Sequence, residues 1–332
     1  MDNMKGFGMM IHALKESPKT IVFTEGTDER ILEAASRLLA GNFLTPILVG
    51  NKEAVLEAAE KYGYNIRGGE IIDPDDYERF DEMVELFCEL RKSKGVTPEQ
   101  AAKTLKSNNY FGTMLVKMGV ADALLGGATY STADTVRPAL QLIKTKPGSS
   151  CVSSCFILVR PSATGENEVL AMGDCAINLK PTEDQLAEIA WEVAECGKHF
   201  GIDPKVAFLS YSTLGSGKGE DVDKMRNAAA KAKELYPSLP IEGELQFDAA
   251  VSPRVARTKC PNSEVAGQAN TFIFPDINAG NIGYKIAQRL GGFDAYGPIL
   301  LGLNAPINDL SRGCNAEEVY SMAIITAALV ED

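Results

Sequence analysis

Histidine is scarce in this sequence: only His12 and His199 occur among 332 residues. Both fall in expected helices, where a structural role is the simpler interpretation. A zinc site built on histidine and a nucleophile activated by histidine are therefore nearly excluded. The seven cysteines show no Cys-x-x-Cys spacing, and no other cluster has the spacing of metal ligands. We expect no metal and no bound cofactor.

Long apolar runs and excess positive charge are also missing. No run approaches the ~20 residues that cross a bilayer, and residues 1–20 lack the pattern of a signal peptide. The net charge of −12 argues against nucleic acid and anionic membranes as partners. It allows a small anionic substrate, because a few local arginines are enough to bind one. Reduced cysteines without a secretory signal indicate a cytoplasmic protein.

Two common phosphate-binding fingerprints are absent. No Gly-x-Gly-x-x-Gly with a distal acid occurs. The stretch YSTLGSGKGED (211–221) resembles a P-loop, but Gly219 follows Lys218 where Ser or Thr is required. Loop 210–219 is either a loop that contacts a ligand or a plain surface loop.

Short apolar runs alternate with helical patterns through the first 143 residues. We expect strands at 20–26, 46–50 and 121–127, and helices at 28–40, 52–61, 76–95, 97–107 and 131–143. Thr97 and Gln100 form a helix-start signal, and Pro138 should kink the helix that contains it. The alternation predicts a largely parallel sheet covered by helices.

The pattern changes at residues 144–154. Segments 154–161 and 167–177 flank the turn 162–166 and predict an antiparallel hairpin. Further strands are expected at 204–213, 240–248, 270–276 and 297–303, and helices at 183–200, 222–236, 281–290 and 317–329. We expect strand 297–303 and the last helix to return to the first domain. The prediction is an α/β protein with domains 1–145 plus 299–332 and 146–298, and a site in the cleft between them.

The stretch ALLGGATYSTADTVRPAL (123–140) joins a buried strand to a helix, which is where α/β proteins bind anions. Thr129, Ser131 and Thr132 supply hydroxyl groups. Arg137 lies further into the helix, where a guanidinium can reach back to a phosphate. The alternative is a capping box between Ser131 and Asp134, with Arg137 solvated.

The stretch INDLSRGCNAEEVY (307–320) places a Ser-Arg-Gly turn before two adjacent carboxylates. Asn315 and Glu318 fit a capping box at the start of the last helix. That interpretation leaves Ser311 and Arg312 unexplained, because a polar, cationic turn after a buried strand has no packing role. We therefore hypothesise a functional site here. Arg91 ends a helix, where a cation favours the helix dipole.

The motifs FTEG, ADALLGGA with TVRPAL, GELQFDAA, ANTFIFPDINAGNIGYK and NDLSRGC resemble, in order and over essentially the whole chain, the phosphate acetyltransferases (phosphotransacetylases). The related phosphate butyryltransferases share parts of this pattern. The resemblance implies a two-domain, three-layer α/β/α fold similar to the isocitrate and isopropylmalate dehydrogenases, and a homodimer. It also implies reversible acetyl transfer between CoA and phosphate, with CoA as substrate.

The resemblance also assigns catalytic roles. Ser311 and Arg312 match active-site residues of the family, and Glu318 stands where the family usually has the aspartate proposed as base. Glu317 and Asp309 are alternative bases, and the capping role of Glu318 competes with catalysis.

Binding roles follow in the same way. Arg91 and Arg137 match two arginines that contact the phosphoryl group, with Thr129, Ser131 and Thr132 as further phosphate ligands. For CoA, the candidate contacts are Ser212, Gly215 and Asn281.

The expected mechanism is direct attack of the CoA thiol in a ternary complex, with Cys314 a packed thiol that takes no part. Three alternatives stay open: a longer acyl group as in phosphate butyryltransferase, an oxidoreductase of similar fold, and a non-catalytic binding protein.

Overall fold

The computed structural model describes residues 5–162, 165 and 167–330. The chain forms two compact units. The five-stranded unit comprises Gly8–Pro147 and Leu303–Asp332, and the six-stranded unit comprises Met1–Phe7 and Gly148–Gly302. Helix α1 (Lys5–Glu16) precedes the first strand. Among the described residues, no helix is both long and apolar enough to cross a bilayer.

A parallel sheet forms the centre of the five-stranded unit. Its strands are β1 (Lys19–Phe23), β2 (Leu44–Val49), β3 (Glu70–Ile72), β4 (Ala123–Gly126) and β11 (Ile307–Asp309). They lie in the order β11-β4-β1-β2-β3, and every pair is parallel. The predicted parallel sheet is confirmed, although the sequence patterns did not indicate β3 or β11.

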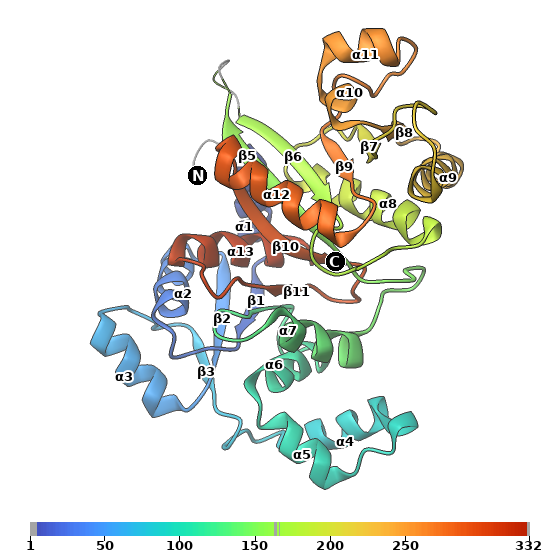
Figure 1. Cartoon of the computed structure of the whole chain (residues 1–332). Coiled ribbons are helices and arrows are strands. Elements are labelled where there is room, and N and C mark those ends of the chain that lie inside the picture. Colours follow the sequence, from blue (N-terminus) through green and yellow to red (C-terminus); the bar gives the residue numbers. More distant parts are fainter. Residues whose placement is uncertain (1–4, 163–164, 166, 331–332) are drawn as a thin grey trace. The chain divides into compact units, whose positions relative to one another are not determined.

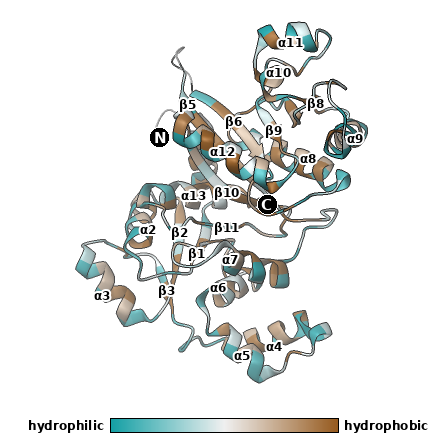
Figure 2. Cartoon of the chain, viewed as in Figure 1, coloured by the Kyte–Doolittle hydropathy of each residue, from teal (hydrophilic) through white to brown (hydrophobic). Residues whose placement is uncertain are grey.

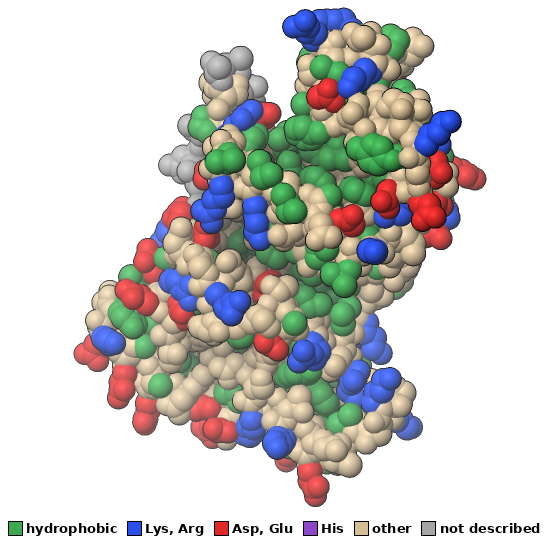
Figure 3. Space-filling model, in the orientation of Figure 1, with side chains coloured by type: hydrophobic (Ala, Val, Ile, Leu, Met, Phe, Trp, Pro, Cys, Tyr) green, Lys and Arg blue, Asp and Glu red, His purple; other side chains and the backbone are tan. Residues whose placement is uncertain are grey.

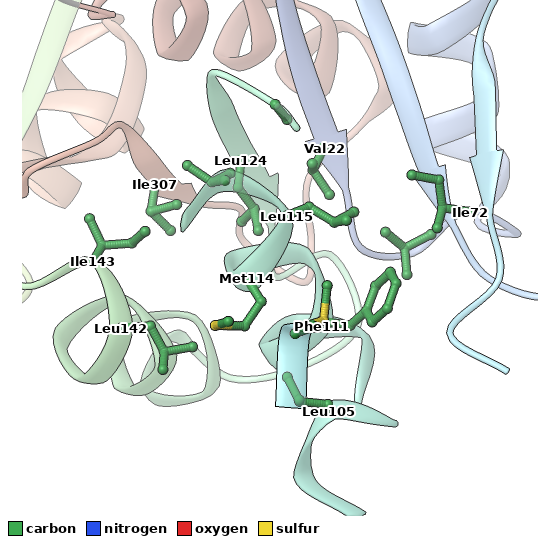
Figure 4. Close-up of a cluster of buried hydrophobic side chains, with 14 of the residues drawn as sticks. Val22, Ile72, Leu105, Phe111, Met114, Leu115, Leu124, Leu142, Ile143 and Ile307 are labelled. Atoms are coloured by element: carbon green, nitrogen blue, oxygen red, sulfur yellow. The ribbon is translucent and has the colours of Figure 1, made fainter. Parts of the chain in front are cut away.

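Helices flank this sheet on both faces (Figure 1). They are α2 (Glu29–Gly41), α3 (Lys52–Tyr62), α4 (Phe80–Leu90), α5 (Pro98–Leu105), α6 (Asn108–Lys117), α7 (Thr132–Pro138) and α13 (Ala316–Ala328). Helices α2 and α13 pack against each other. On the other face, Val22, Leu124 and Ile307 meet side chains of α6 such as Met114 and Leu115 (Figure 4). Alternate strand residues point to opposite faces, so both faces are buried.

Local signals explain where several helices begin and end. The predicted capping box of α5 is present, with Thr97 and Gln100 exchanging side-chain to backbone hydrogen bonds. Asp28 caps α2 by accepting from the N–H of Arg30. The helix predicted at 131–143 changes at Pro138 from α7 to a π-helical turn, Ala139–Ile143, as expected where proline removes a backbone donor. Helix α6 was not predicted.

The six-stranded unit has a mixed sheet. Its strands are β5 (Ser153–Pro161), β6 (Asn167–Gly173), β7 (Val206–Leu209), β8 (Ile241–Leu245), β9 (Thr271–Ile273) and β10 (Asp294–Leu301), in the order β10-β5-β6-β9-β7-β8. The predicted hairpin is confirmed, since β5 and β6 pair antiparallel. Its predicted turn, 162–166, includes residues 163, 164 and 166, which lie outside the described residues.

One strand was assigned to the wrong sheet. The segment predicted at 297–303 forms β10, which pairs antiparallel with β5 in the six-stranded unit. The strand that joins the first sheet at this point of the chain is β11, which pairs with β4. The composition of a buried strand does not indicate which strand it pairs with, so the sequence pattern did not distinguish β10 from β11.

Helices also cover both faces of the mixed sheet. They are α8 (Glu183–His199), α9 (Glu220–Leu235), α10 (Phe247–Val251), α11 (Pro253–Lys259) and α12 (Ile277–Gly291). Helices α8 and α9 pack together against the strands, while Tyr284 of α12 stacks on Phe156 of β5. Several helices carry both hydrophilic and hydrophobic residues (Figure 2), as helices between a sheet and water should. Each unit is therefore a three-layer α/β/α structure.

Candidate functional site

Three strand ends meet at one edge of the five-stranded sheet. Strands β11, β4 and β1 are neighbours and run parallel, so the loops that follow them leave the same edge. Each loop leads into a helix, α13, α7 or α2. This geometry brings the two sequence-predicted stretches, 123–140 and 307–320, together at the position where parallel sheets bind ligands.

The Ser-Arg-Gly turn is held by its backbone and exposes its side chains. Ser311 and Arg312 are both exposed. The N–H of Cys314 donates to the carbonyl of Ser311 at 2.9 Å. From α2, Nη1 of Arg30 donates to the carbonyl oxygens of Arg312 and Cys314 at 2.9 and 3.1 Å. The arginine and hydroxyl side chains are thus available to a ligand while their backbone is fixed.

Glu318 has a structural partner. Its carboxylate accepts from the N–H of Asn315 at 3.0 Å, and its own N–H donates to Oδ1 of Asn315 at 2.9 Å. The predicted capping box is confirmed. Its neighbour Glu317 pairs with Arg37 at 2.5 Å.

Glu25 was missed as a site residue by sequence reasoning, although it belongs to the FTEG motif. It is 8% exposed and lies just beyond β1. Its Oε1 accepts from the N–H groups of Gly127 and Thr129 at 2.9 and 3.2 Å, and its Oε2 accepts from the hydroxyl of Thr24 at 2.7 Å. Burial raises the pKa of Glu25 above its ordinary value, against these hydrogen bonds. A carboxylate at the end of a buried strand was the available signal.

Tyr130 extends this hydrogen-bonded group. Its hydroxyl lies 2.7 Å from that of Thr24. Thr24 has a single hydroxyl proton and Glu25 accepts it, so Tyr130 is the donor. Burial raises the pKa of Tyr130, which keeps its phenol protonated.

A cavity of about 510 Å³ opens beside these residues. Its lining comes from the loop between β1 and α2, the start of α6, the loop after β4 and the first turn of α7: Thr24, Glu25, Thr27, Asp28, Ser107, Asn108, Asn109, Thr129, Tyr130 and Asp134. Hydroxyl, amide and carboxyl groups dominate this list. The cavity is therefore suited to a polar ligand.

Ser131 and Asp134, at the start of α7, do not form the capping box that was considered as an alternative for them. The hydroxyl of Ser131 donates to the carboxylate of Asp134 at 2.7 Å and caps no backbone N–H. This bond, with a smaller effect from Arg137, lowers the pKa of Asp134. Arg137 lies 3.6 Å from Asp134, and its side chain is 57% exposed. The guanidinium is thus oriented by a weak surface pair and remains open to an anion.

Arg91 and Arg137, which lie 46 positions apart in the sequence, both lie near the phenol of Tyr110. Burial raises the pKa of Tyr110, and the charges of Arg137 and Arg91 oppose that rise. The hydroxyl itself donates to Gln141 at 3.0 Å. Arg91 is the residue that ends α4, as the sequence indicated. Two cations near one point form a local positive field in an acidic protein.

Thr132 points to another partner. Its hydroxyl donates to Oδ2 of Asp309 at 2.6 Å, and the hydroxyl of Thr135 donates to Oδ1 at 2.6 Å. Asp309 is 1% exposed. The alternative base named from the sequence is therefore a buried acceptor whose two oxygens are both occupied.

The three predicted CoA contacts belong to the six-stranded unit. Ser212 is fully buried, and its hydroxyl donates to Glu244 at 2.8 Å. The N–H of Gly215 donates to the same carboxylate at 2.7 Å. Asn281, near the start of α12, donates to the carbonyl of Cys175 at 3.1 Å. Within the described residues, no group of three or more His, Cys, Asp or Glu side chains is arranged to hold a metal.

Known proteins match this chain over nearly its full length. The family model described as Phosphate acetyl/butaryl transferase matches residues 8–327. The phosphate acetyltransferase of Bacillus subtilis is 54% identical over 308 residues, which are 93% of this chain and 94% of that protein. The crystal structure of a phosphotransacetylase from Streptococcus pyogenes has 55% identity and a TM-score of 0.94, and the match covers 99% of both chains.

A more distant structure, from Salmonella typhimurium and assigned as a 4-hydroxythreonine-4-phosphate dehydrogenase, has 13% identity and a TM-score of 0.54, covering 95% of this chain and all of that one. That likeness concerns the fold alone and agrees with the expected similarity to dehydrogenases. The family model and these relatives match the sequence and the fold of this chain over nearly its full length. The chain therefore belongs to the phosphate acetyl/butaryl transferase family.

Proposed function

We propose that this protein transfers an acetyl group reversibly between CoA and phosphate, as a phosphate acetyltransferase. The observation that carries this proposal is the meeting of the exposed Ser311-Arg312 turn with the hydroxyl-rich loop 127–132 at one sheet edge. Relatives named for this activity match 93% and 99% of the chain. No finding favours a longer acyl group.

Attack of the CoA thiol on acetyl phosphate develops negative charge at two places. The carbonyl oxygen becomes anionic, and Arg312 with the Ser311 hydroxyl is suited to stabilise it. The departing phosphate gains charge, and Arg91 and Arg137 are suited to bind it. Thr129 and Ser131 add hydroxyl groups on the same side, and Thr132 helps to orient α7 through its hydrogen bond to Asp309.

The thiol proton needs an acceptor, because the thiolate is the nucleophile. Glu318 is our candidate, since its carboxylate follows the Ser-Arg-Gly turn. One of its oxygens accepts from Asn315, which leaves the other for the thiol. The acetyl group passes directly from phosphate to sulfur. Burial raises the pKa of Cys314 to about 11, so this thiol stays protonated and forms no acyl-enzyme.

Three further assignments belong to the same proposal. Loop 210–219, with Gly215, and the start of α12, with Asn281, contact CoA. Ser212, also predicted as a contact, is fully buried and supports the loop through Glu244 instead. All seven cysteines are free thiols, which suits a reducing cytoplasm.

The protein works as a homodimer. Exposed hydrophobic side chains support this, namely those of Phe247, Ile282, Ile286 and Leu290. Hydrophobic side chains gather around a hollow of the six-stranded unit (Figure 3). Light scattering on the purified chain measures the assembly, and a monomer at micromolar concentration would refute it.

The testing experiment is the initial rate of thioester formation from CoA and acetyl phosphate without added divalent metal. Wild type, Arg312→Ala and Glu318→Gln are compared, with butyryl phosphate as a second substrate. Glutamine keeps the capping box intact, so Glu318→Gln removes the base and leaves the cap. We expect fast wild-type turnover, preference for acetyl phosphate, and a severe loss in both variants.

The control for the cap is Asn315→Ala, which breaks the capping box and keeps the carboxylate. Equal rates for wild type and Glu318→Gln would reduce Glu318 to a helix cap. Absence of turnover in wild type would overturn the proposed activity itself.

A further inference from the structure

Asp309 occupies an unusual position for a carboxylate. It is the last residue of β11, two residues before Ser311, and is 1% exposed. Both oxygens accept hydroxyl groups from one helix: Oδ2 from Thr132 and Oδ1 from Thr135, each at 2.6 Å. The strand end that carries the Ser-Arg-Gly turn is thereby bonded to the first turn of α7.

Packing alone does not account for this residue. The described interactions of Asp309 include no lysine or arginine, and burial raises its pKa against the two hydroxyl bonds. A buried carboxyl without a cation is less favourable than an apolar side chain of the same size. Such groups concentrate at functional sites, where geometry matters more than stability.

The backbone around Asp309 is fitted to the neighbouring loop. The N–H of Leu310 donates to the carbonyl of Gly126 at 2.7 Å. Gly127 has a φ of +100°, and a Cβ at that position would lie 2.2 Å from Oδ1 of Asp309. The carboxylate therefore sits directly against the turn that follows β4. Movement of either loop displaces the other.

We propose that Asp309 is a positioning residue, which holds α7 in register with the Ser311-Arg312 turn through the hydroxyl groups of Thr132 and Thr135. Helix α7 carries Arg137, and the turn carries Arg312, so one carboxylate sets the spacing between the two charged groups. This inference rests on the proposed function. Asp309 is 1% exposed and does not line the cavity, so it acts through these neighbours and does not take the thiol proton.

Substitutions of nearly equal size test the proposal. Thr135→Val removes the hydroxyl and keeps the shape, Thr135→Ser restores the hydroxyl, and Asp309→Asn removes the charge. We expect Asp309→Asn and Thr135→Val each to lower kcat/KM for acetyl phosphate at least about tenfold, because small misplacements of a binding group are costly in rate. The KM for CoA should change by less than about threefold, since α7 bears the proposed phosphate ligands.

Two comparisons separate positioning from a merely structural role. Thr135→Ser should recover most of the rate lost in Thr135→Val. The double variant Asp309→Asn with Thr135→Val should be no slower than the slower single variant, because both changes act on the same hydrogen bond, from Thr135 to Asp309. Asp122→Asn is the matched control: this exposed aspartate accepts from the N–H of Thr20 at 2.7 Å, next to the opposite end of β4. It should leave the rate unchanged.

The outcomes are distinct. Wild-type turnover together with near-normal rates in Asp309→Asn and Thr135→Val would overturn this proposal and leave the proposed function intact. Three further results would overturn it: rate losses of the two single variants that multiply in the double variant, a rate in Thr135→Ser no higher than in Thr135→Val, or an equal rise in the KM values for CoA and for acetyl phosphate. A wild type without turnover would refute the proposed function instead. Circular dichroism and thermal unfolding on each variant show that folded protein is being compared.

Discussion

Nη1 of Arg30 donates a 2.9 Å hydrogen bond to the main-chain oxygen of Arg312, across 282 positions of the sequence. The same nitrogen also reaches the carbonyl of Cys314. Nε and Nη2 of Arg30 bind the two carboxylate oxygens of Asp28, and Nη2 binds the carbonyl of Ala128. One guanidinium thus fixes the backbone from which another guanidinium projects.

Replacing Arg30 by lysine should impair activity more than stability. An ammonium group cannot reproduce the planar fork that serves Asp28 and several carbonyl groups at once. We expect kcat to fall at least about tenfold, because the Ser-Arg-Gly turn loses its support. The measurement is the thioester-formation rate beside a urea titration. Arg79→Lys is the control, since Arg79 makes a similar two-point contact with Glu82 on the surface. Equal losses in both variants would contradict the prediction.

Asn315→Ala should lower the free energy of unfolding by about 1 kcal/mol, the usual effect of losing an N-cap. The reason is the loss of the hydrogen bond from the N–H of Glu318 to Oδ1 of Asn315. Urea denaturation of Asn315→Ala and Glu318→Gln measures the effect. A stability loss in Glu318→Gln as large as that in Asn315→Ala would show that glutamine does not preserve the cap.

Cys314→Ala should keep most of the activity. Burial raises the pKa of this thiol to about 11, so only roughly a thousandth is thiolate at pH 8, too little for an efficient nucleophile. Alkylation by iodoacetamide should therefore be slower at Cys314 than at the half-buried thiol of Cys88. Rate measurements on the variant and peptide mapping after alkylation check both statements. A burst of acylated enzyme with acetyl phosphate alone would contradict them.

Glu25 should make stability decline as pH rises from its ordinary pKa of 4.5 toward its higher folded pKa. A raised pKa means that the folded state binds the proton more readily than the unfolded chain, so folding is favoured at low pH and less so above. Glu25→Gln should flatten this part of the profile. Thermal unfolding at a series of pH values measures it, with the exposed Glu57→Gln as control. Identical profiles for wild type and Glu25→Gln would refute the prediction.

Gly127→Ala should destabilise the protein by at least about 3 kcal/mol, since it combines a strained φ with a steric clash. The new Cβ would lie 2.2 Å from Asp309 Oδ1. Gly95→Ala is the matched control, because Gly95 also has a positive φ but no atom within 4 Å of its Cβ position. We expect about 1–2 kcal/mol there, from the backbone alone. If both variants lost a similar free energy of unfolding, the structure around Asp309 would be able to accommodate the new Cβ with little destabilisation.

Local patterns in the sequence predicted what depends on neighbouring residues. The capping boxes at Thr97 and Asn315, the change of helix at Pro138 and the β5–β6 hairpin all arise within a few residues. Strands β3 and β11, three residues long each, were not predicted. Strand β9 is equally short but lies in the apolar run TFIF, whereas β3 and β11 lie among polar residues that give no strand pattern.

The same distinction holds for the site residues: those marked by neighbouring residues were predicted, and those that depend on distant partners were not. Ser311, Arg312 and Arg137 were named because each stands out in its own stretch. Arg30 and Glu25 act through partners 282 and 102 positions away, and a single sequence contains no sign of such pairs. Asp309 was named from the sequence as an alternative base because of its carboxyl group, but its hydroxyl donors lie more than 170 positions upstream, and the sequence pattern did not indicate them.

Strand β11 pairs with β4, but the ribosome synthesises the two strands far apart in time. Residues 148–302, which contain the whole six-stranded sheet, are translated between these two strands. Until β11 emerges, the nascent chain has an open edge at β4, the row of N–H and C=O groups that invites pairing with another chain. The Ser-Arg-Gly turn comes later still. The growing polypeptide therefore passes most of its synthesis without a complete site, and the segment that completes the site also closes the edge.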